Sequence, residues 1–165
     1  MKNKVMLIGA IDAGKTTLIN KLLGKDVSAL KTQSLLYYDW IVDTPGEYTE
    51  NPMFYKNIMA TSLEVTHVCY IQDATRNKNI FPPGFSRGIT KLPIALVTKC
   101  DHDEANLKRA TEMLMKVVFK GPLLYTSALE GTGLEHLKAL VECKTLEEMR
   151  EYVESRESHQ LIFIN

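Results

Sequence analysis

The residues from Gly9 to Thr16 carry the clearest chemistry in the sequence. Their order matches G-x-x-x-x-G-K-[ST], the pattern of loops that bind the phosphates of a nucleoside triphosphate. The glycines let the backbone curl so that successive N–H groups point at phosphate oxygens, and the helix that follows adds partial positive charge. Lys15 is expected on the β- and γ-phosphates and the Thr16 hydroxyl on Mg²⁺. The predicted phosphate-binding residues are Gly9, Asp12, Ala13, Gly14, Lys15, Thr16 and Thr17.

A second motif, Asp43-Thr44-Pro45-Gly46, ends a run of apolar residues. At the end of a strand and downstream of a phosphate loop, Asp43 is expected to bind Mg²⁺ through water, and Gly46 can bring its backbone N–H to the γ-phosphate. Ras-type enzymes place a glutamine at the next position to orient the attacking water. Glu47 stands there instead. It either holds water too or is a solvated residue, because its charge faces the phosphate unfavourably.

Thr32 is the candidate for the first switch segment, where a threonine completes the Mg²⁺ shell; the alternative is a solvent-facing residue that opens a strand. The predicted metal ligands are Thr16, Thr32 and Asp43, and the predicted catalytic residues are Lys15, Thr32, Gly46 and Glu47. No arginine partner of the γ-phosphate is identifiable, because Arg76 and Arg87 fall in an irregular segment, Asp73–Lys91, and are expected to be exposed. We therefore predict slow hydrolysis, at ~10⁻⁴–10⁻² s⁻¹.

Asp12 raises a question about monovalent cations. It lies where K⁺-activated GTPases carry a cation-ligating Asn or Asp, and a K⁺ bound there would substitute for the charge of an arginine. The alternative is a polar residue that caps the turn of the loop. Both interpretations are kept open.

These motifs need a scaffold in which strand ends meet, and the chain alternates short β-type runs with helical patterns, as βαβ units do. The Tyr38–Trp40 connection is too short for a crossover, so one edge strand is expected to be antiparallel. The predicted strands are Val5–Gly9, Ser34–Tyr38, Trp40–Asp43, His67–Gln72, Pro93–Thr98 and Pro122–Thr126. The predicted helices are Lys15–Leu23, Asn51–Leu63, Asp103–Phe119, one that begins at Thr132 with Glu135 in a capping box, and Thr145–Glu154.

The predicted fold class is α/β: a three-layer, G-domain-like P-loop NTPase domain over residues 1–142 with a mostly parallel central sheet. Residues 143–165 are predicted to add an extra helix and the apolar tail Leu161–Ile164. That tail either packs on its own domain or serves as an interaction strand.

The composition of the chain indicates which kinds of partner it is not expected to bind. The 165 residues contain 20 basic and 20 acidic side chains, so no global field attracts the chain to nucleic acid or to an anionic membrane. No apolar run reaches the length of a membrane span. Three widely spaced cysteines indicate neither a zinc site nor a disulfide framework. We expect a cytoplasmic protein with reduced thiols, one domain, and no nucleic-acid or membrane partner.

The segment Thr98-Lys99-Cys100-Asp101 resembles the [N/T]-K-x-D motif of the translation-factor-related GTPases. The resemblance implies that Asp101 pairs with the ring N–H and amine of guanine, a pattern that adenine lacks. It also implies that Lys99 packs along the base and that backbone N–H groups of Ser127, Ala128 and Leu129 meet the guanine oxygen. The implied base-binding residues are therefore Thr98, Lys99, Asp101, Ser127, Ala128 and Leu129, and the implied ligand is GTP with Mg²⁺.

A narrower resemblance covers nearly all of residues 1–140. The order of the P-loop, Lys31-Thr32-Gln33, Asp43-Thr44-Pro45-Gly46-Glu47-Tyr48, Pro82-Pro83-Gly84-Phe85, Leu96-Val97-Thr98-Lys99 and Thr126-Ser127-Ala128-Leu129-Glu130 is similar to the ethanolamine-utilisation protein P / propanediol-utilisation protein V family. Asp12 and the tail beyond Glu142 depart from that pattern. The family implies a GTPase-like protein associated with bacterial microcompartments that degrade ethanolamine or 1,2-propanediol.

Three functions follow as hypotheses. The first is a Mg²⁺-dependent GTP-binding protein with slow GTP hydrolysis in such a microcompartment system. The second is a nucleotide-dependent acetate kinase, with Asn77–Lys91 as the only spare segment for an acceptor pocket. The third is a non-hydrolysing module that binds nucleotide and a shell protein. The sequence leaves the oligomeric state open.

Overall fold

A single mixed sheet organises the chain. The computed structural model describes residues 2–24 and 34–165. The strands are β1 (Val5–Ile8), β2 (Leu36–Tyr37), β3 (Ile41–Asp43), β4 (His67–Asp73), β5 (Leu92–Thr98), β6 (Gly121–Tyr125) and β7 (Leu161–Ile164). The helices are α1 (Lys15–Leu23), α2 (Glu47–Glu50), α3 (Tyr55–Ser62), α4 (Leu107–Met115), α5 (Leu134–Glu142) and α6 (Leu146–Glu154), with the short 3₁₀ helices η1 (Pro52–Phe54) and η2 (Phe85–Gly88).

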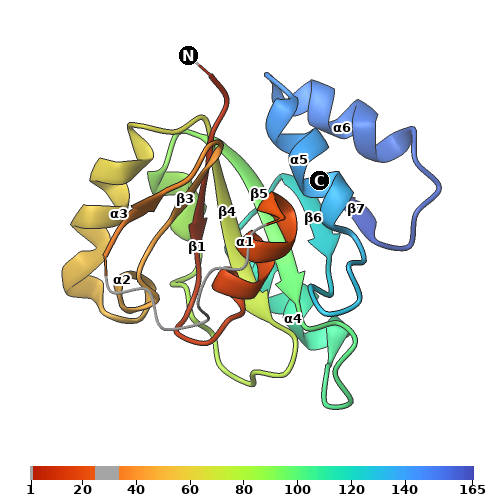
Figure 1. Ribbon diagram of the computed structural model, residues 1–165, viewed down its shortest axis with the longest axis horizontal. Helices are drawn as coiled ribbons and strands as arrows, with labels where there is room; N and C mark the ends of the chain where they lie inside the picture. The colour runs from red at the N-terminus through yellow and green to blue at the C-terminus, as the bar shows by residue number, and fades with distance from the viewer. Residues whose placement is uncertain (1, 25–33) are drawn as a thin grey trace.

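The strand order is β2-β3-β1-β4-β5-β6-β7. The five inner strands run parallel, and the two edge strands, β2 and β7, are antiparallel to their neighbours. The predicted α/β fold and its mostly parallel sheet are confirmed. After β1 the chain goes to β3 on one side and then to β4 on the other, so the end of β1 is a topological switch point. The loops that follow β1, β4 and β5 all lie at the lower edge of the view in Figure 1.

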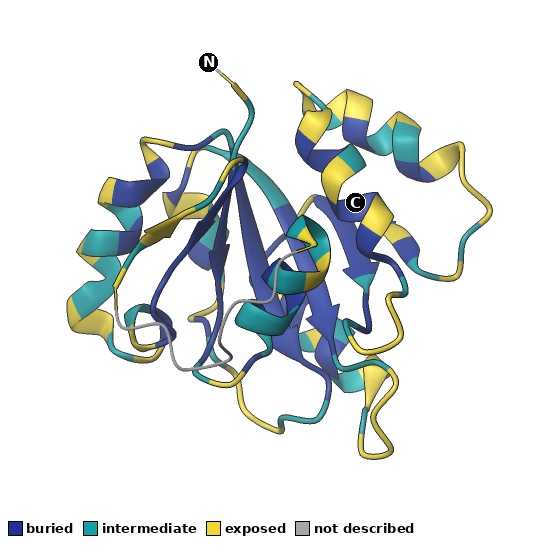
Figure 2. Cartoon of the chain, viewed as in Figure 1, coloured by how far each residue is buried: buried dark blue, intermediate teal, exposed yellow. Residues whose placement is uncertain are grey.

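The sheet separates two apolar layers, because successive residues of a strand point to opposite faces. In β1, Val5 and Leu7 join the core beside α1, α5 and α6, whereas Met6 and Ile8 join the core beside α3 and α4. All four residues are fully buried. Figure 2 shows that the inner strands are buried along most of their length, whereas the helices carry both buried and exposed residues. None of the described helices is long and apolar enough to cross a membrane.

Three helix starts differ from the sequence prediction. The predicted helix Asn51–Leu63 begins as the 3₁₀ helix η1, capped by the Asn51 side chain, and is α-helical only from Tyr55. The predicted helix Asp103–Phe119 is shorter and runs over Leu107–Met115, because the Asn106 side chain caps it by accepting a bond from the Arg109 N–H at 3.0 Å. The predicted capping box at Thr132 and Glu135 is wrong. Helix α5 begins after Gly133, which has a φ of 78°, and no side chain caps its first turn. A Cβ at Gly133 would clash with the Tyr125 carbonyl. The helix therefore begins where the backbone of Gly133 passes close to Tyr125, which only glycine allows.

The C-terminal residues belong to the same structural body. Thr145 caps α6, since its hydroxyl accepts a bond from the Glu148 N–H at 3.1 Å. Met149 and Val153 of α6 lie in the core that also contains α1 and α5. Strand β7 extends the sheet beyond β6, with Leu161 and Ile164 buried. The apolar tail therefore packs on its own sheet.

This placement predicts a stability effect far from the phosphate loop. Met149→Ala removes a fully buried side chain, so we expect a loss of about 2–5 kcal/mol in the free energy of unfolding. Glu151→Ala, on the exposed face of the same helix, is the matched control and should change it by less than about 0.5 kcal/mol. Urea unfolding measures both. Equal stability of Met149→Ala and the wild type would contradict the assignment of α6 to the core.

Candidate nucleotide-binding site

The backbone carbonyls of the phosphate loop are bound by side chains from several elements. The Lys15 Nζ donates to the carbonyls of Gly9 and Ala10, at 3.1 and 3.2 Å. The Arg76 guanidinium donates to the Ile11 carbonyl at 3.1 Å. The next two carbonyls accept from Lys99 Nζ at 2.8 Å and from Thr98 Oγ1 at 2.7 Å. With the carbonyls of residues 9–13 fixed in this way, the loop has the geometry in which N–H groups turn inward toward a phosphate.

Lys15 is oriented by its own loop. Its ammonium has three N–H donors, and two carbonyls bind it, so one donor remains for a ligand. Burial lowers its pKa, while the negative charges of Asp43, Glu50 and Asp12 oppose this shift. A buried ammonium with one unused N–H donor favours an anion such as a phosphate as its additional partner.

Lys99 links the loop to the end of β4. Its Nζ contacts the Asp73 carboxylate at 2.8 Å in addition to the Asp12 carbonyl. Burial alone would raise the pKa of Asp73, but hydrogen bonds from Lys99 and Thr75 outweigh it and hold that pKa below its ordinary value. Both Asp12 and Lys99 have a φ near 60°, which non-glycine residues seldom adopt. This strain is concentrated where the two motifs meet.

The Asp43-Thr44-Pro45-Gly46 motif lies directly against the phosphate loop. A Cβ on Gly46 would stand 2.5 Å from the Ile11 nitrogen, so only glycine fits there. Asp43 is buried at the end of β3, and the Thr44 hydroxyl donates to the Leu7 carbonyl of β1 at 2.8 Å. The two motifs are therefore in contact.

The donor set suits a Mg²⁺ ion shared with phosphates. Among the described residues there is no cluster of three His, Cys, Asp or Glu side chains that would hold a metal without help. Thr16, the second residue of α1, and the buried Asp43 supply oxygen donors beside Lys15. Mg²⁺ is commonly held by one or two protein oxygens together with phosphates and water, so these residues fit that role.

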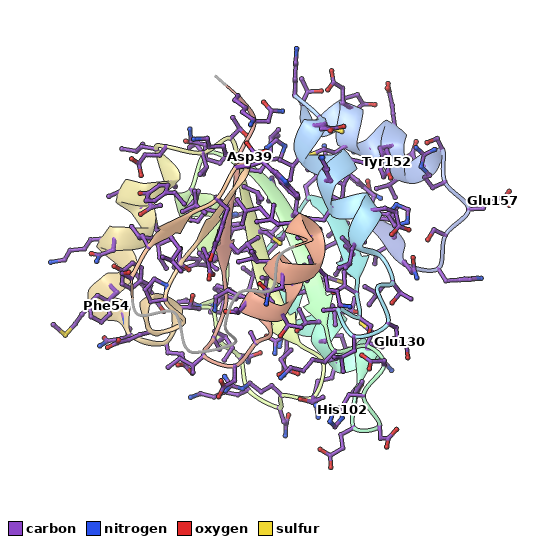
Figure 3. All side chains as sticks on the ribbon, viewed as in Figure 1. Asp39, Phe54, His102, Glu130, Tyr152 and Glu157 are labelled. Atoms are coloured by element: carbon purple, nitrogen blue, oxygen red, sulfur yellow. The ribbon has the colours of Figure 1, made fainter. Side chains whose placement is uncertain are left out.

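A cavity of about 270 Å³ opens beside the phosphate loop. It is lined by Gly14, Thr17, Leu18, Thr98, Lys99, Asp101, His102, Thr126, Ala128 and Leu129. Asp101 lies at its exposed edge and accepts a bond from the Ser127 hydroxyl at 2.6 Å. Figure 3 shows the neighbouring side chains of His102 and Glu130 at the same end of the molecule, where two loops converge. Five of the six residues predicted to bind a base line the cavity, and the sixth, Ser127, contacts it through Asp101.

The other residues singled out in the sequence are not all found where they were expected. Thr32 lies outside the described residues. Glu47 is the first residue of α2 and its side chain is exposed. The expectation of exposure was wrong for Arg76, whereas Arg87 is exposed as expected. Arg76 is half-buried against the phosphate loop and pairs with Glu50 at 3.4 Å, and the Arg87 guanidinium lies 4.6 Å from the centre of the Phe119 ring.

Comparisons with known proteins identify the family of the chain. The family model described as "Ethanolamine utilisation - propanediol utilisation" matches residues 1–143. The chain is 30% identical to the propanediol utilization protein PduV of Citrobacter freundii, over 86% of this chain and 94% of that protein. It is 29% identical to the probable acetate kinase EutP of Escherichia coli K12, over 81% and 86% of the two chains.

A solved structure supports the fold assignment. The bacterial selenocysteine-specific elongation factor EF-Sec matches with a TM-score of 0.57 and 26% identity over 93% of this chain. The chain spans only 29% of the length of that larger protein. The fold is therefore that of a P-loop G domain.

The Lys99–Asp73 contact predicts a pH-dependent stability effect. Lys99→Met should lower the free energy of unfolding by roughly 1–3 kcal/mol near pH 7, less than for a fully buried pair because Lys99 is partly exposed. A carboxyl whose pKa is lowered in the folded state stabilises the fold above its unfolded pKa, and loses that effect as the pH falls through the folded value. The deficit of Lys99→Met should therefore shrink below pH 3.8, the ordinary pKa of Asp73.

Denaturant unfolding between pH 2.5 and 7 measures this dependence. Lys108→Met, which removes an exposed lysine of α4, is the control and should show neither the deficit nor its pH dependence. A deficit for Lys99→Met that stays constant down to pH 2.5 would contradict the role given to Asp73.

Proposed function

Because the chain belongs to the ethanolamine utilisation–propanediol utilisation family, we propose that it is a Mg²⁺-dependent GTP-binding protein with slow GTP hydrolysis in one of these catabolic systems. The observation that carries the proposal is the position of the Thr98–Asp101 segment. Lys99 contacts the phosphate loop, while Asp101 faces the adjoining cavity. A base and its phosphates can therefore be bound by one continuous surface.

Guanine suits this cavity better than adenine. The Asp101 carboxylate accepts hydrogen bonds, and the Watson–Crick edge of guanine offers two adjacent donors, the ring N–H and the amine. Adenine would leave part of that carboxylate unpaired. Lys99 supplies an alkyl stem beside the cavity, and Leu129, which is 77% exposed, lies free to cover the base.

Slow turnover of GTP follows from the residue after Asp43-Thr44-Pro45-Gly46, the DxxG motif. Glu47 carries a negative charge where a water-orienting glutamine would be neutral, and its side chain points into solvent. Charge repulsion from the γ-phosphate disfavours its approach. We therefore propose hydrolysis within ~10⁻⁴–10⁻² s⁻¹, the range of G proteins that act without a partner.

A K⁺ ion at Asp12 is not part of the proposal. The Asp12 carbonyl already accepts a hydrogen bond from the Lys99 ammonium. This ammonium places a positive charge beside Asp12, which opposes a second cation there.

We place the protein in the cytoplasm, in association with a bacterial microcompartment, on the strength of its family. A shell protein is the corresponding partner. The segment Leu161–Ile164 is paired with β6 and has Leu161 and Ile164 buried, so packing on its own sheet accounts for its apolar character. This weakens the hypothesis of a non-hydrolysing shell module, which relied on that segment.

The second candidate is an acetate kinase, favoured by the curated names of the EutP relatives. The segment Asn77–Lys91, which would have to form an acceptor pocket, is anchored elsewhere. Phe81 and Phe85 pack on Tyr70, with ring centres 5.7 and 6.5 Å away, and the Gly84 N–H donates to the Lys116 carbonyl at 2.7 Å. These contacts tie the segment to the core beside α3 and α4.

An assay with acetate separates the two functions. GTP or ATP is supplied with acetate and hydroxylamine, which traps any acyl phosphate as a hydroxamate. We expect no hydroxamate above the level of a Lys15→Ala control, because water and not acetate takes the γ-phosphoryl group. Hydroxamate that forms faster than free phosphate, and only when Lys15 is present, would favour the kinase.

Base recognition is tested by nucleotide titration. Asp101→Asn replaces the acceptor with an amide that donates, so GTP affinity should fall about 100-fold or more while XTP affinity rises. Asp103→Asn, a neighbouring exposed carboxylate, should leave both unchanged. Wild-type binding of ATP as tight as that of GTP would overturn the proposed specificity.

A further inference from the structure

Arg76 makes two contacts that the proposed function has not used. One guanidinium nitrogen donates to the Ile11 carbonyl at 3.1 Å, and the other lies 3.4 Å from the Glu50 carboxylate. Both side chains are about 30% exposed, so the pair is within reach of solvent and of a bound ligand. The contact joins three segments that are far apart in the sequence: the loop after β4, helix α2 and the phosphate loop.

The local backbone fixes where Arg76 points. The Asp73 carboxylate accepts bonds from the Thr75 N–H at 2.8 Å and from the Thr75 hydroxyl at 2.7 Å. The Arg76 N–H donates to the Asp73 carbonyl at 3.2 Å. This turn directs the chain back over the phosphate loop directly after β4. Its sequence signal is an Asp followed two residues later by Thr, which is too common to identify Arg76 in advance.

Ile11 marks the γ-phosphate end of the loop. Gly46, whose N–H is predicted to meet the γ-phosphate, approaches the Ile11 nitrogen so closely that a Cβ would stand 2.5 Å from it. The base cavity is instead lined by Gly14 and Thr17, at the other end of the loop. Arg76 therefore lies at the end where the γ-phosphate is expected, away from the base.

Glu50 belongs to the same end of the site. Its N–H donates to the Gly46 carbonyl at 3.2 Å, so α2 begins directly after the last residue of the DxxG motif. Its carboxylate also acts on the Lys15 ammonium. Two cations, Lys15 and Arg76, therefore lie near the expected γ-phosphate position. The carboxylates of Asp43, Glu50 and Asp12 act on Lys15, and of these Glu50 also contacts Arg76.

We propose that Arg76 is an arginine supplied in cis to the γ-phosphoryl group, and that Glu50 holds its guanidinium at the rim of the phosphate loop until nucleotide binds. This inference rests on the proposed GTP hydrolysis. It replaces the expectation that the chain has no arginine of its own for the reaction.

The reaction assigns Arg76 an electrostatic role. A water oxygen forms a bond to the γ-phosphorus while the bond to the β–γ bridging oxygen breaks, and GDP leaves with that electron pair. The proton of the water ends on inorganic phosphate or in solvent. Arg76 is not consumed; its planar guanidinium binds the phosphoryl oxygens and offsets the negative charge that they share with the leaving oxygen. The arriving phosphate competes with Glu50 for the same N–H groups.

The test makes the same three measurements on the wild type and on four variants. GTP affinity is measured first by fluorescence titration, then phosphate release in a single turnover, then binding of GDP with aluminium fluoride, which mimics the phosphoryl group in transfer. The variants are Arg76→Ala, Arg76→Lys, Glu50→Gln and, as control, Arg87→Ala from the same loop.

Arg76→Ala should bind GTP within about threefold of the wild type, hydrolyse it at least tenfold more slowly, and fail to form the aluminium fluoride complex. Arg76→Lys keeps the charge without the bidentate fork, so it should bind GTP normally and recover only part of the rate. If Arg76→Ala does not fold, Arg76→Lys takes its place as the test of whether Arg76 acts on the γ-phosphoryl group. Glu50→Gln should be as fast as the wild type or faster, and Arg87→Ala should match the wild type.

Several outcomes would overturn the inference. One is a rate for Arg76→Ala within twofold of the wild type, and another is an unchanged aluminium fluoride complex. A loss of GTP affinity that matches the loss of rate would show that Arg76 only braces the loop. A tenfold slower Glu50→Gln would refute the holding role of Glu50. Failure of the wild type to bind GTP at all is a separate result, which removes the proposed function itself.

Discussion

The structure depends on the outward-facing carbonyls of the phosphate loop. A loop can present its N–H groups to a phosphate only if its carbonyls are bound elsewhere, because buried backbone acceptors without partners are costly. Here the donors are Lys15 from the loop itself, Thr98 with Lys99 from the end of β5, and Arg76 from the end of β4, whose place at the Ile11 carbonyl water can take because Arg76 is 31% exposed. Three of these four side chains are cations, so the same contacts that shape the loop also make its surroundings suitable for an anion.

The sheet topology brings these donors together. Strands β1, β4 and β5 are parallel neighbours, so their carboxyl ends lie side by side, and a residue just beyond one strand reaches the loop beyond the next. Gly46 completes the arrangement from β3, on the opposite side of β1. The site therefore needs the fold as a whole, and the apolar layers on both faces, together with the added α6 and β7, hold the strand ends in register.

What the sequence could predict was local in character. The phosphate loop, the DxxG motif and the Thr98–Asp101 segment are contiguous, and each follows an apolar strand, so their meeting at one sheet edge follows from parallel topology. The contact of Arg76 with Ile11 spans 65 residues and depends on one turn after β4, so no periodic pattern reveals it. The start of α5 was mispredicted for a similar reason: Thr132 and Glu135 have the composition of a cap, but the approach of Gly133 to the Tyr125 carbonyl determines the backbone there.

The central claim is that one surface binds guanine and its phosphates together. A crystal structure of the protein with GDP and Mg²⁺ tests it most directly. The account predicts guanine in the cavity beside Asp101, phosphates on the N–H groups of the phosphate loop, and Lys15 bound to them while it keeps its contacts with the Gly9 and Ala10 carbonyls. A base bound outside that cavity, or phosphates held away from Lys15, would contradict it.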